Sequence, residues 1–307
     1  MRGSWVRVPR GPRINWGGSM ARPMAVRLRK TLKRFRREKE PDLVAVPDQD
    51  AGPGRDQEIP RVVFQTAESR LVHPTHAKSI AEFRALNPDL AFQMFGVEER
   101  DRYMGSVWGN HPIYEVYKRA VFGQMKADIF RYCIVVERGG YYFDFNKGCS
   151  KPLTQFHPPE AEGLISYETN PELLFPEPGV ARQLQNPFNL VMQWAFGFRP
   201  EHPILQRVID RIVQIEPYFR DKVFRNPKAA LLTMSAPGIF TAVFREYVAT
   251  HGLSGIVEAG DDLWGNGIFR LRGSKVLKSE VAYYGRLADR AIVLSSPTGT
   301  KPNPDRT

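Results

Sequence analysis

Two oppositely charged residues, Asp128 and Arg131, lie in the run KADIFRYCIVVERGGYYFDFN, which spans residues 126–146. Residues three apart share one face of an α-helix, so their side chains are expected to lie together. Apolar residues recur at helical spacing over 121–136, and glycines 139 and 140 then favour the left-handed conformation that ends a helix. Taken alone, the charged pair is better explained as an ion pair on a solvated helix face.

The aromatic run after these glycines predicts a strand over 141–145. Because side chains alternate along a strand, Tyr142, Asp144 and Asn146 are expected on one side. Ligands of open α/β sheets bind beyond the carboxyl ends of strands. A carboxylate two residues from a second oxygen ligand suits a hard divalent cation that holds a diphosphate, and the tyrosine is able to pack on a sugar ring. The alternative is a strand end whose polar residues enter a turn.

Further strands are expected over 61–66, 90–95 and 163–167, and further helices over 76–86, 97–104, 203–215 and 237–247. Alternating strands and helices predict an α/β fold with helices on both faces of the sheet. We expect a tail and linker over 1–57, one folded domain over 58–296 and a disordered tail over 297–307. The two cysteines form no CxxC motif, which argues against a disulfide framework or a zinc site.

The formal net charge of +11 arises in the first 40 residues, which hold 13 Lys and Arg and 2 Asp and Glu. The rest of the chain is balanced, so a nucleic-acid footprint on the folded domain is not expected. Residues 24–39 combine an apolar stripe with basic residues and predict either a helix on an anionic membrane surface or a solvated tail. The chain lacks an 18-residue apolar run and a signal-peptide pattern. A cytoplasmic protein, peripheral at the inner face of the membrane, is therefore expected.

Several motifs occur in the order typical of glycosyltransferase family 32, the DXD sugar-binding group related to yeast-type α-mannosyltransferases. The segment IPRVVFQT at 59–66 is similar to the family's opening strand, and NP at 87–88 to the element before its second strand. The run from Asp128 to Asn146 resembles its A-x-x-D-x-x-R-Y and G-G-x-Y-x-D-x-D patterns. PEHP at 200–203 and SAPG at 235–238 resemble later turns of the family.

The resemblance implies a single Rossmann-like GT-A domain and a retaining transfer of hexose from a UDP- or GDP-hexose donor to a glycan or glycolipid, as in polysaccharide biosynthesis. It implies a divalent cation, Mn²⁺ or Mg²⁺, held by Asp144 and Asn146. The roles it implies elsewhere are catalysis and donor binding by Asp128, Arg131 and Asp144, stacking by Tyr142, and a nucleotide base pocket lined by Phe64, Gln65 and Thr66.

Because the sequence departs from the family pattern at two places, two other functions remain alternatives to the glycosyltransferase function. Asn146 replaces the second carboxylate, which is expected to weaken cation binding, and the family's late His and Gly-Ser-Trp have no clear match. One alternative is therefore a catalytically degenerate protein that binds nucleotide-sugar. A second alternative is a membrane-surface or nucleic-acid adaptor that acts through the basic tail.

Overall fold

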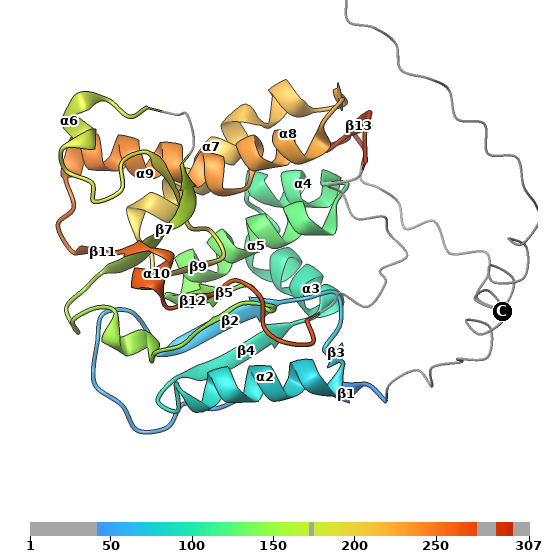
Figure 1. The fold of residues 1–307 in the computed structure, drawn as a ribbon. Helices are drawn as coiled ribbons and strands as arrows, with labels where there is room; N and C mark the ends of the chain where they lie inside the picture. Colours follow the sequence, from blue (N-terminus) through green and yellow to red (C-terminus); the bar gives the residue numbers. More distant parts are fainter. Residues whose placement is uncertain (1–41, 172–174, 275–286, 297–307) are drawn as a thin grey trace, which may run out of the picture. The chain divides into compact units, whose positions relative to one another are not determined.

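The computed structural model describes residues 42–171, 175–274 and 287–296. A mixed sheet crosses this part of the chain and contains parallel and antiparallel strand pairs. Its strands lie in the spatial order β11 (Ile256–Asp261), β7 (Gly163–Pro171), β9 (Ala195–Phe198), β5 (Gly140–Phe143), β2 (Val62–Thr66) and β4 (Ala91–Phe95), with β8 (Asn189–Val191) also paired to β7 (Figure 1).

Helices cover both faces of this sheet (Figure 1). One face packs against α2 (Pro74–Ala85), whose Phe83 contacts the rings of Phe92 and Phe143. The other face carries the larger core, built with α3 (Val97–Trp108), α4 (Pro112–Arg119), α5 (Gly123–Arg138), α7 (Pro203–Phe219), α8 (Pro227–Met234) and α9 (Pro237–His251). The expected α/β architecture, with helices on both faces of a mixed sheet, is confirmed.

The remaining elements are short and lie outside the main sheet. Two are the helices α6 (Pro178–Ala181) and α10 (Asp262–Gly265), and one is the 3-10 turn η1 (Leu153–Gln155). Three antiparallel ribbons pair β1 (Val44–Ala45) with β3 (Leu71–Val72), β6 (Gly148–Cys149) with β12 (Gly267–Ile268), and β10 (Val223–Phe224) with β13 (Arg290–Ala291).

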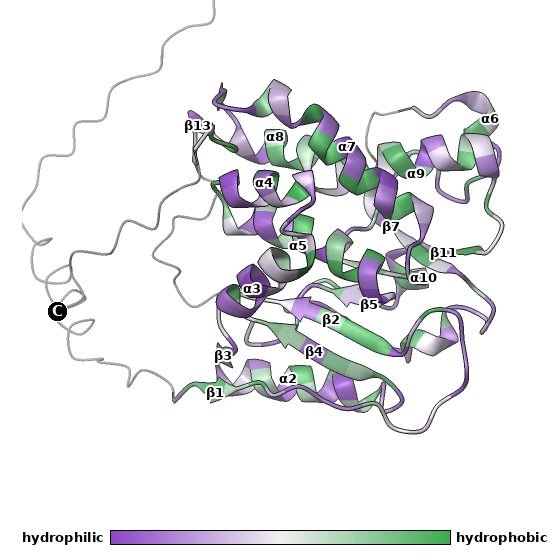
Figure 2. Ribbon diagram, turned by 180° about the vertical axis from the view of Figure 1, so that it is seen from behind, coloured by the Kyte–Doolittle hydropathy of each residue, from purple (hydrophilic) through white to green (hydrophobic). Residues whose placement is uncertain are grey.

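Side-chain alternation along the central strands explains the two cores. Val63 and Tyr141 belong to the core on the α2 side, whereas Phe64 and Tyr142 belong to the core under α5, α7 and α9. Strand β2 is accordingly largely hydrophobic, while α3 presents mostly hydrophilic residues (Figure 2). Because both faces are covered, each central strand buries side chains on both sides.

The expected strands and helices are all present, with ends that differ by a few residues. The difference that matters for the site is the end of the strand predicted over 141–145. Strand β5 ends at Phe143, and a turn follows. The amide of Lys147 donates to the carbonyl of Asp144 across this turn, at 2.9 Å. The sequence analysis identified neither α4 nor the strands β9 and β11.

Residues 42–57, the last part of the expected tail and linker over 1–57, contact the folded unit. Gln49 exchanges two backbone hydrogen bonds with Phe92, and Val46 is buried. Arg55 donates to the carbonyls of Thr154 and His157 at 2.8 and 2.7 Å. The expected tails over 1–41 and 297–307, including the amphipathic stretch 24–39, lie outside the described residues. None of the described helices has the length and apolar character that crossing a membrane would need.

Three of the described helices begin after a histidine that is followed by proline, and this histidine has a structural role in each. His73, His111 and His202 precede the proline at the start of α2, α4 and α7. In each, the ring nitrogen Nδ1 accepts a hydrogen bond from the amide two residues later. The proline has no amide to satisfy and its fixed φ suits the first helical turn.

Gly139, between α5 and β5, adopts φ +63°, where residues with a Cβ are strained. A Cβ there would lie 2.6 Å from the Cδ of Pro200 and 2.8 Å from that of Pro60. We therefore expect Gly139→Ala to lower the free energy of unfolding by about 1–2 kcal/mol, measured by urea denaturation. Gly179→Ala is the matched control, because no atom lies within 4 Å of a Cβ there. An equal loss in both variants would contradict the argument.

Candidate functional site

The four charged and aromatic residues singled out in the run 126–146 come together at the carboxyl end of β5. Arg131 Nη2 lies 2.8 Å from Asp128 Oδ1 and 3.3 Å from Asp144 Oδ1. The hydroxyl of Tyr142 donates to the same Asp144 oxygen at 3.1 Å. Helix α5 reverses direction through Gly139 into β5, which places its first half beside the strand's last residues. These four residues of the local segment thus form one cluster.

This cluster is buried, so the interpretation of Asp128 and Arg131 as a solvated surface pair is wrong. The side chains of Arg131 and Asp128 are 7% and 10% exposed. The guanidinium lies 4.6 Å from the centroid of the Tyr142 ring, and its Nη1 donates to the carbonyl of Gln193 at 3.0 Å. Asp144 is the member that reaches solvent, with its side chain 30% exposed. A ligand approaching β5 therefore meets Asp144 first.

Asp128 is held from its other side by Ser235, whose hydroxyl donates to Asp128 Oδ2 at 3.0 Å. Burial raises the pKa of Asp128 to about 7, and the charge of Asp144 adds to this effect, while Arg131 opposes it. A carboxyl that titrates near neutral pH inside a cluster is a common feature of functional sites.

The raised pKa of Asp128 predicts that stability falls as pH rises. Between about pH 4, where this carboxyl titrates in the unfolded chain, and about pH 7, the folded chain keeps a proton that the unfolded chain has lost. We expect the free energy of unfolding to fall by about 2–3 kcal/mol from pH 5 to pH 8 relative to Asp128→Asn, measured by urea denaturation. Asp210→Asn, which alters an exposed carboxylate on α7, is the control. Parallel profiles for wild type and Asp128→Asn would contradict this pKa.

Gln193 and Ser235 were missed as site residues by the sequence analysis. Gln193 Nε2 donates to the hydroxyl of Tyr132 at 2.7 Å and to the carbonyl of Ser235 at 2.9 Å. They fix the segments before β9 and before α9 against α5. The SAPG resemblance pointed to the turn at Ser235, but no local pattern pointed to Gln193.

The three residues expected to line a nucleotide base pocket are buried at the end of β2. Phe64 packs in the core, 6.4 Å from the Phe95 ring between centroids. The hydroxyl of Thr66 donates to the carbonyl of Phe95 at 2.9 Å and accepts from Arg100 at 3.2 Å. Gln65 Oε1 is buried and has no hydrogen-bond partner among the residues described. The ring of Phe64 is therefore not brought to a ligand-accessible surface.

Asn146 does not continue the alternation of β5, because it lies in the turn after Asp144. Its carbonyl accepts from the amide of Leu271 at 2.9 Å. Asp144 is the one carboxylate of the motif, and its Oδ1 already contacts Arg131 and Tyr142. No group of three or more His, Cys, Asp or Glu side chains in the described ranges is placed to hold a metal. These residues do not fit a tightly held divalent cation, since Asn146 is neutral and a guanidinium contacts the remaining carboxylate.

Lys147, next in the same turn, is a further candidate that the sequence analysis did not identify. It is 7% exposed. Its Nζ lies 3.1 Å from the centroid of the Phe269 ring and 5.4 Å from that of Trp194. Burial lowers the pKa of Lys147, and the carboxylate of Asp144, followed by those of Glu168 and Asp262, opposes this effect. A positive side chain thus lies beside Asp144.

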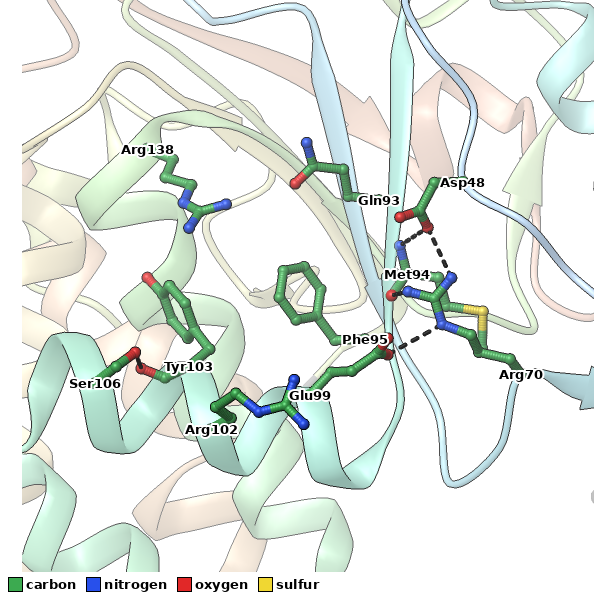
Figure 3. A pocket seen from close by; sticks show the side chains of 10 residues that line it. All are labelled: Asp48, Arg70, Gln93, Met94, Phe95, Glu99, Arg102, Tyr103, Ser106 and Arg138. Carbon is green, nitrogen blue, oxygen red and sulfur yellow. Dashed lines mark hydrogen bonds and ion pairs between the residues drawn. The ribbon is translucent and has the colours of Figure 1, made fainter.

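A separate hollow of about 280 Å³ lies beside β4 and α3 (Figure 3). Arg70 on its wall pairs with Asp48 and Glu99, while Arg102 and Arg138 lie at its other side. None of the residues from the Asp128–Asp144 cluster lines it. Its charges are largely engaged with one another, and we assign it no ligand.

Comparisons with known proteins find a family match over the segment that contains this cluster. Residues 74–163 match the family model described as "Glycosyltransferase sugar-binding region containing DXD motif". The chain is similar to the initiation-specific alpha-1,6-mannosyltransferase of Schizosaccharomyces pombe, with 23% identity over 201 residues that cover 62% of this chain and 49% of that protein. It is 24% identical over 212 residues to inositol phosphoceramide mannosyltransferase 1 of the same organism, covering 68% of this chain and 58% of that protein.

The chain spans about half the length of the curated relatives it matches. Among solved structures, the PaToxG glycosyltransferase is similar, with 14% identity and a TM-score of 0.44, over 64% of this chain and 72% of that one.

Proposed function

We propose that this chain is a glycosyltransferase of the family 32 type expected from the sequence, because residues 74–163 match the model of the DXD sugar-binding region. It transfers a hexose from a nucleotide diphosphate sugar to a hydroxyl of a glycan or glycolipid. The names of its relatives favour mannose as the sugar and a glycan or inositol phosphoceramide type of acceptor.

The observation that carries this proposal is the buried cluster of Asp128, Arg131 and Tyr142 behind a partly exposed Asp144. Buried, mutually paired charges hold their positions without reorganising, which is what binding a polar sugar requires. In this proposal Asp144 accepts hydrogen bonds from sugar hydroxyls and Arg131 donates hydrogen bonds to them. The face of the Tyr142 ring packs against the Arg131 guanidinium in a cation–π contact.

The reaction that we propose breaks the bond between C1 of the hexose and the β-phosphate oxygen. The bonding electrons leave with the nucleoside diphosphate while the acceptor oxygen bonds to C1 on the same face, and the acceptor proton passes to the departing diphosphate. The configuration at C1 is retained. In this scheme the chain's own groups position the donor and stabilise charge on the leaving group, and no side chain serves as a dedicated base.

Release of nucleoside diphosphate from a panel of UDP- and GDP-hexoses tests the proposal, because slow donor hydrolysis needs no acceptor. Release from one donor, GDP-mannose first, supports a transferase and identifies its sugar. A thermal shift without release supports the second candidate, a protein that binds nucleotide-sugar, which the replacement of a carboxylate by Asn146 motivates. Neither release nor a shift with any donor would contradict both.

We also propose that the N-terminal tail binds a membrane surface. The basic residues of 24–39 are suited to an anionic bilayer at the cytoplasmic face, where a lipid-linked acceptor would lie. Sedimentation with anionic and neutral vesicles, for the whole chain and for a variant that lacks residues 1–39, measures this contribution. Equal sedimentation of the two proteins would reject it.

A further inference from the structure

Lys147 presents an unusual environment for an ammonium group. The residue is 7% exposed. Its Nζ lies against two aromatic rings, those of Trp194 and Phe269. Among the described residues Nζ makes no hydrogen bond and no close ion pair, although the carboxylates of Asp144, Glu168 and Asp262 act on its charge. A buried charge without a hydrogen-bonded counterpart is unfavourable unless an anion completes it.

The position of Lys147 indicates what that anion is. The residue follows Asn146 directly, and its amide is bonded to the carbonyl of Asp144. The segment that carries Phe269 is tied to the same turn, because β12 pairs with β6 and Leu271 donates to Asn146. This segment also brings the exposed Arg270 close enough for its charge to act on Lys147. Two positive side chains, Lys147 and Arg270, therefore lie at the turn that carries the sugar-binding motif, together with the carboxylates of Asp144, Glu168 and Asp262.

The composition of this turn differs from that of a cation site. A site that holds a divalent ion collects carboxylates, whereas here one carboxylate position is an amide and the next residue is a lysine. Asp144, the remaining carboxylate, is in contact with the Arg131 guanidinium at 3.3 Å. The turn has an amide where the family pattern has a carboxylate, and a lysine follows it, which suits direct binding of a phosphate anion.

On the basis of the proposed function, we infer that Lys147 binds the diphosphate of the nucleotide-sugar donor and supplies the positive charge that neutralises it, so that donor binding needs no divalent cation. In this complex the ammonium donates hydrogen bonds to the phosphate oxygens while the rings of Trp194 and Phe269 stay beside it. When the C1–oxygen bond breaks, the electrons remain on the diphosphate, and the ammonium stabilises the added negative charge.

Nucleotide binding in the presence of EDTA tests this inference, with UDP, GDP, UMP and GMP as probes in calorimetric titrations. The wild-type chain is expected to bind one nucleoside diphosphate more tightly than its monophosphate without metal. In Lys147→Met the affinity for that diphosphate should fall about 10- to 100-fold, as expected for loss of a charged hydrogen bond, while monophosphate affinity stays within about threefold. Methionine keeps the apolar stem, so the variant retains the packing on Trp194 and Phe269.

Two further variants separate charge from structure. Lys147→Arg keeps the positive charge and is expected to recover part of the diphosphate affinity, which a purely structural role of the lysine would not predict. Lys228→Met removes an exposed lysine of α8 and should bind every nucleotide like the wild type. Thermal unfolding of each variant without ligand checks that all are folded at the titration temperature.

The outcomes distinguish this inference from the proposed function. Diphosphate binding that requires Mn²⁺ and is unchanged in Lys147→Met would overturn the role of Lys147 and leave the glycosyltransferase proposal intact. Binding in EDTA that Lys147→Met does not weaken would also overturn it. If no nucleoside diphosphate binds with or without Mn²⁺, both are rejected.

Discussion

Replacing Asp144 by alanine is expected to slow nucleoside diphosphate release about 10²- to 10³-fold, the range measured when one preorganised polar group is removed from an active site. Asp144 is the solvent-reaching member of the cluster, and Arg131 and Tyr142 fix its carboxylate in place. A donor sugar bound at the end of β5 therefore contacts a carboxylate that needs no reorientation. The measurement is release from the donor identified in the panel, at saturating and at limiting concentration.

The Asp144→Ala variant should remain folded, because its side chain is 30% exposed and its loss leaves Arg131 paired with Asp128. Asp210→Ala, an exposed aspartate on α7, is the activity control. An Asp144→Ala protein that unfolds normally and releases nucleoside diphosphate at the wild-type rate would remove Asp144 from the site.

Replacing Arg131 by methionine has the largest expected effect on stability, a loss of about 3–5 kcal/mol in the free energy of unfolding. Above about pH 7, where Asp128 is ionised, the change leaves this buried carboxylate without its counter-charge, and it removes the cation from the Tyr142 ring. Methionine fills much of the same volume, so the loss reports charge rather than a cavity. Urea denaturation with a fixed slope measures it.

Arg211→Met provides a matched control for Arg131→Met. Arg211 also forms a short ion pair, with Glu246 at 2.7 Å, but the two side chains are 35% and 54% exposed. Its loss should cost at most about 1 kcal/mol. Adding Asp128→Leu to Arg131→Met should recover part of the lost stability, because it removes the uncompensated carboxylate. Equal losses in the free energy of unfolding for Arg131→Met and Arg211→Met would show that burial of the Asp128–Arg131 pair does not increase its contribution to stability.

The parts of the site that the sequence predicted are those that lie close together in the chain. Local periodicity placed Asp128 with Arg131 on one helix face and Tyr142 with Asp144 on one side of a strand, and the family resemblance joined the two pairs in one site. The prediction for Asn146 failed because strand alternation was extended beyond Phe143, where a turn replaces the strand. Local periodicity does not indicate where a strand stops pairing.

The missed parts depend on contacts between distant segments. Strand β9 is four residues long, and its Gly197 is required because a Cβ there would lie 2.6 Å from the Tyr141 ring. Nothing near residue 197 in the sequence reveals that ring. Gln193 and Lys147 were missed for the same reason, since their partners lie on α5, near Ser235 and at Phe269.

The position of β5 in the sheet also determines when the site forms during synthesis. Tyr142 is paired with Phe64 on one side and with Phe196 on the other, so the central strand gains its second neighbour only after residue 196 has left the ribosome. The cluster is closed later still, when Ser235 reaches Asp128. We therefore expect the hydrogen bonds of Asp128 to be completed late in folding. Variants that weaken the contacts of Ser235 are therefore expected to slow maturation of the chain after its first half has formed.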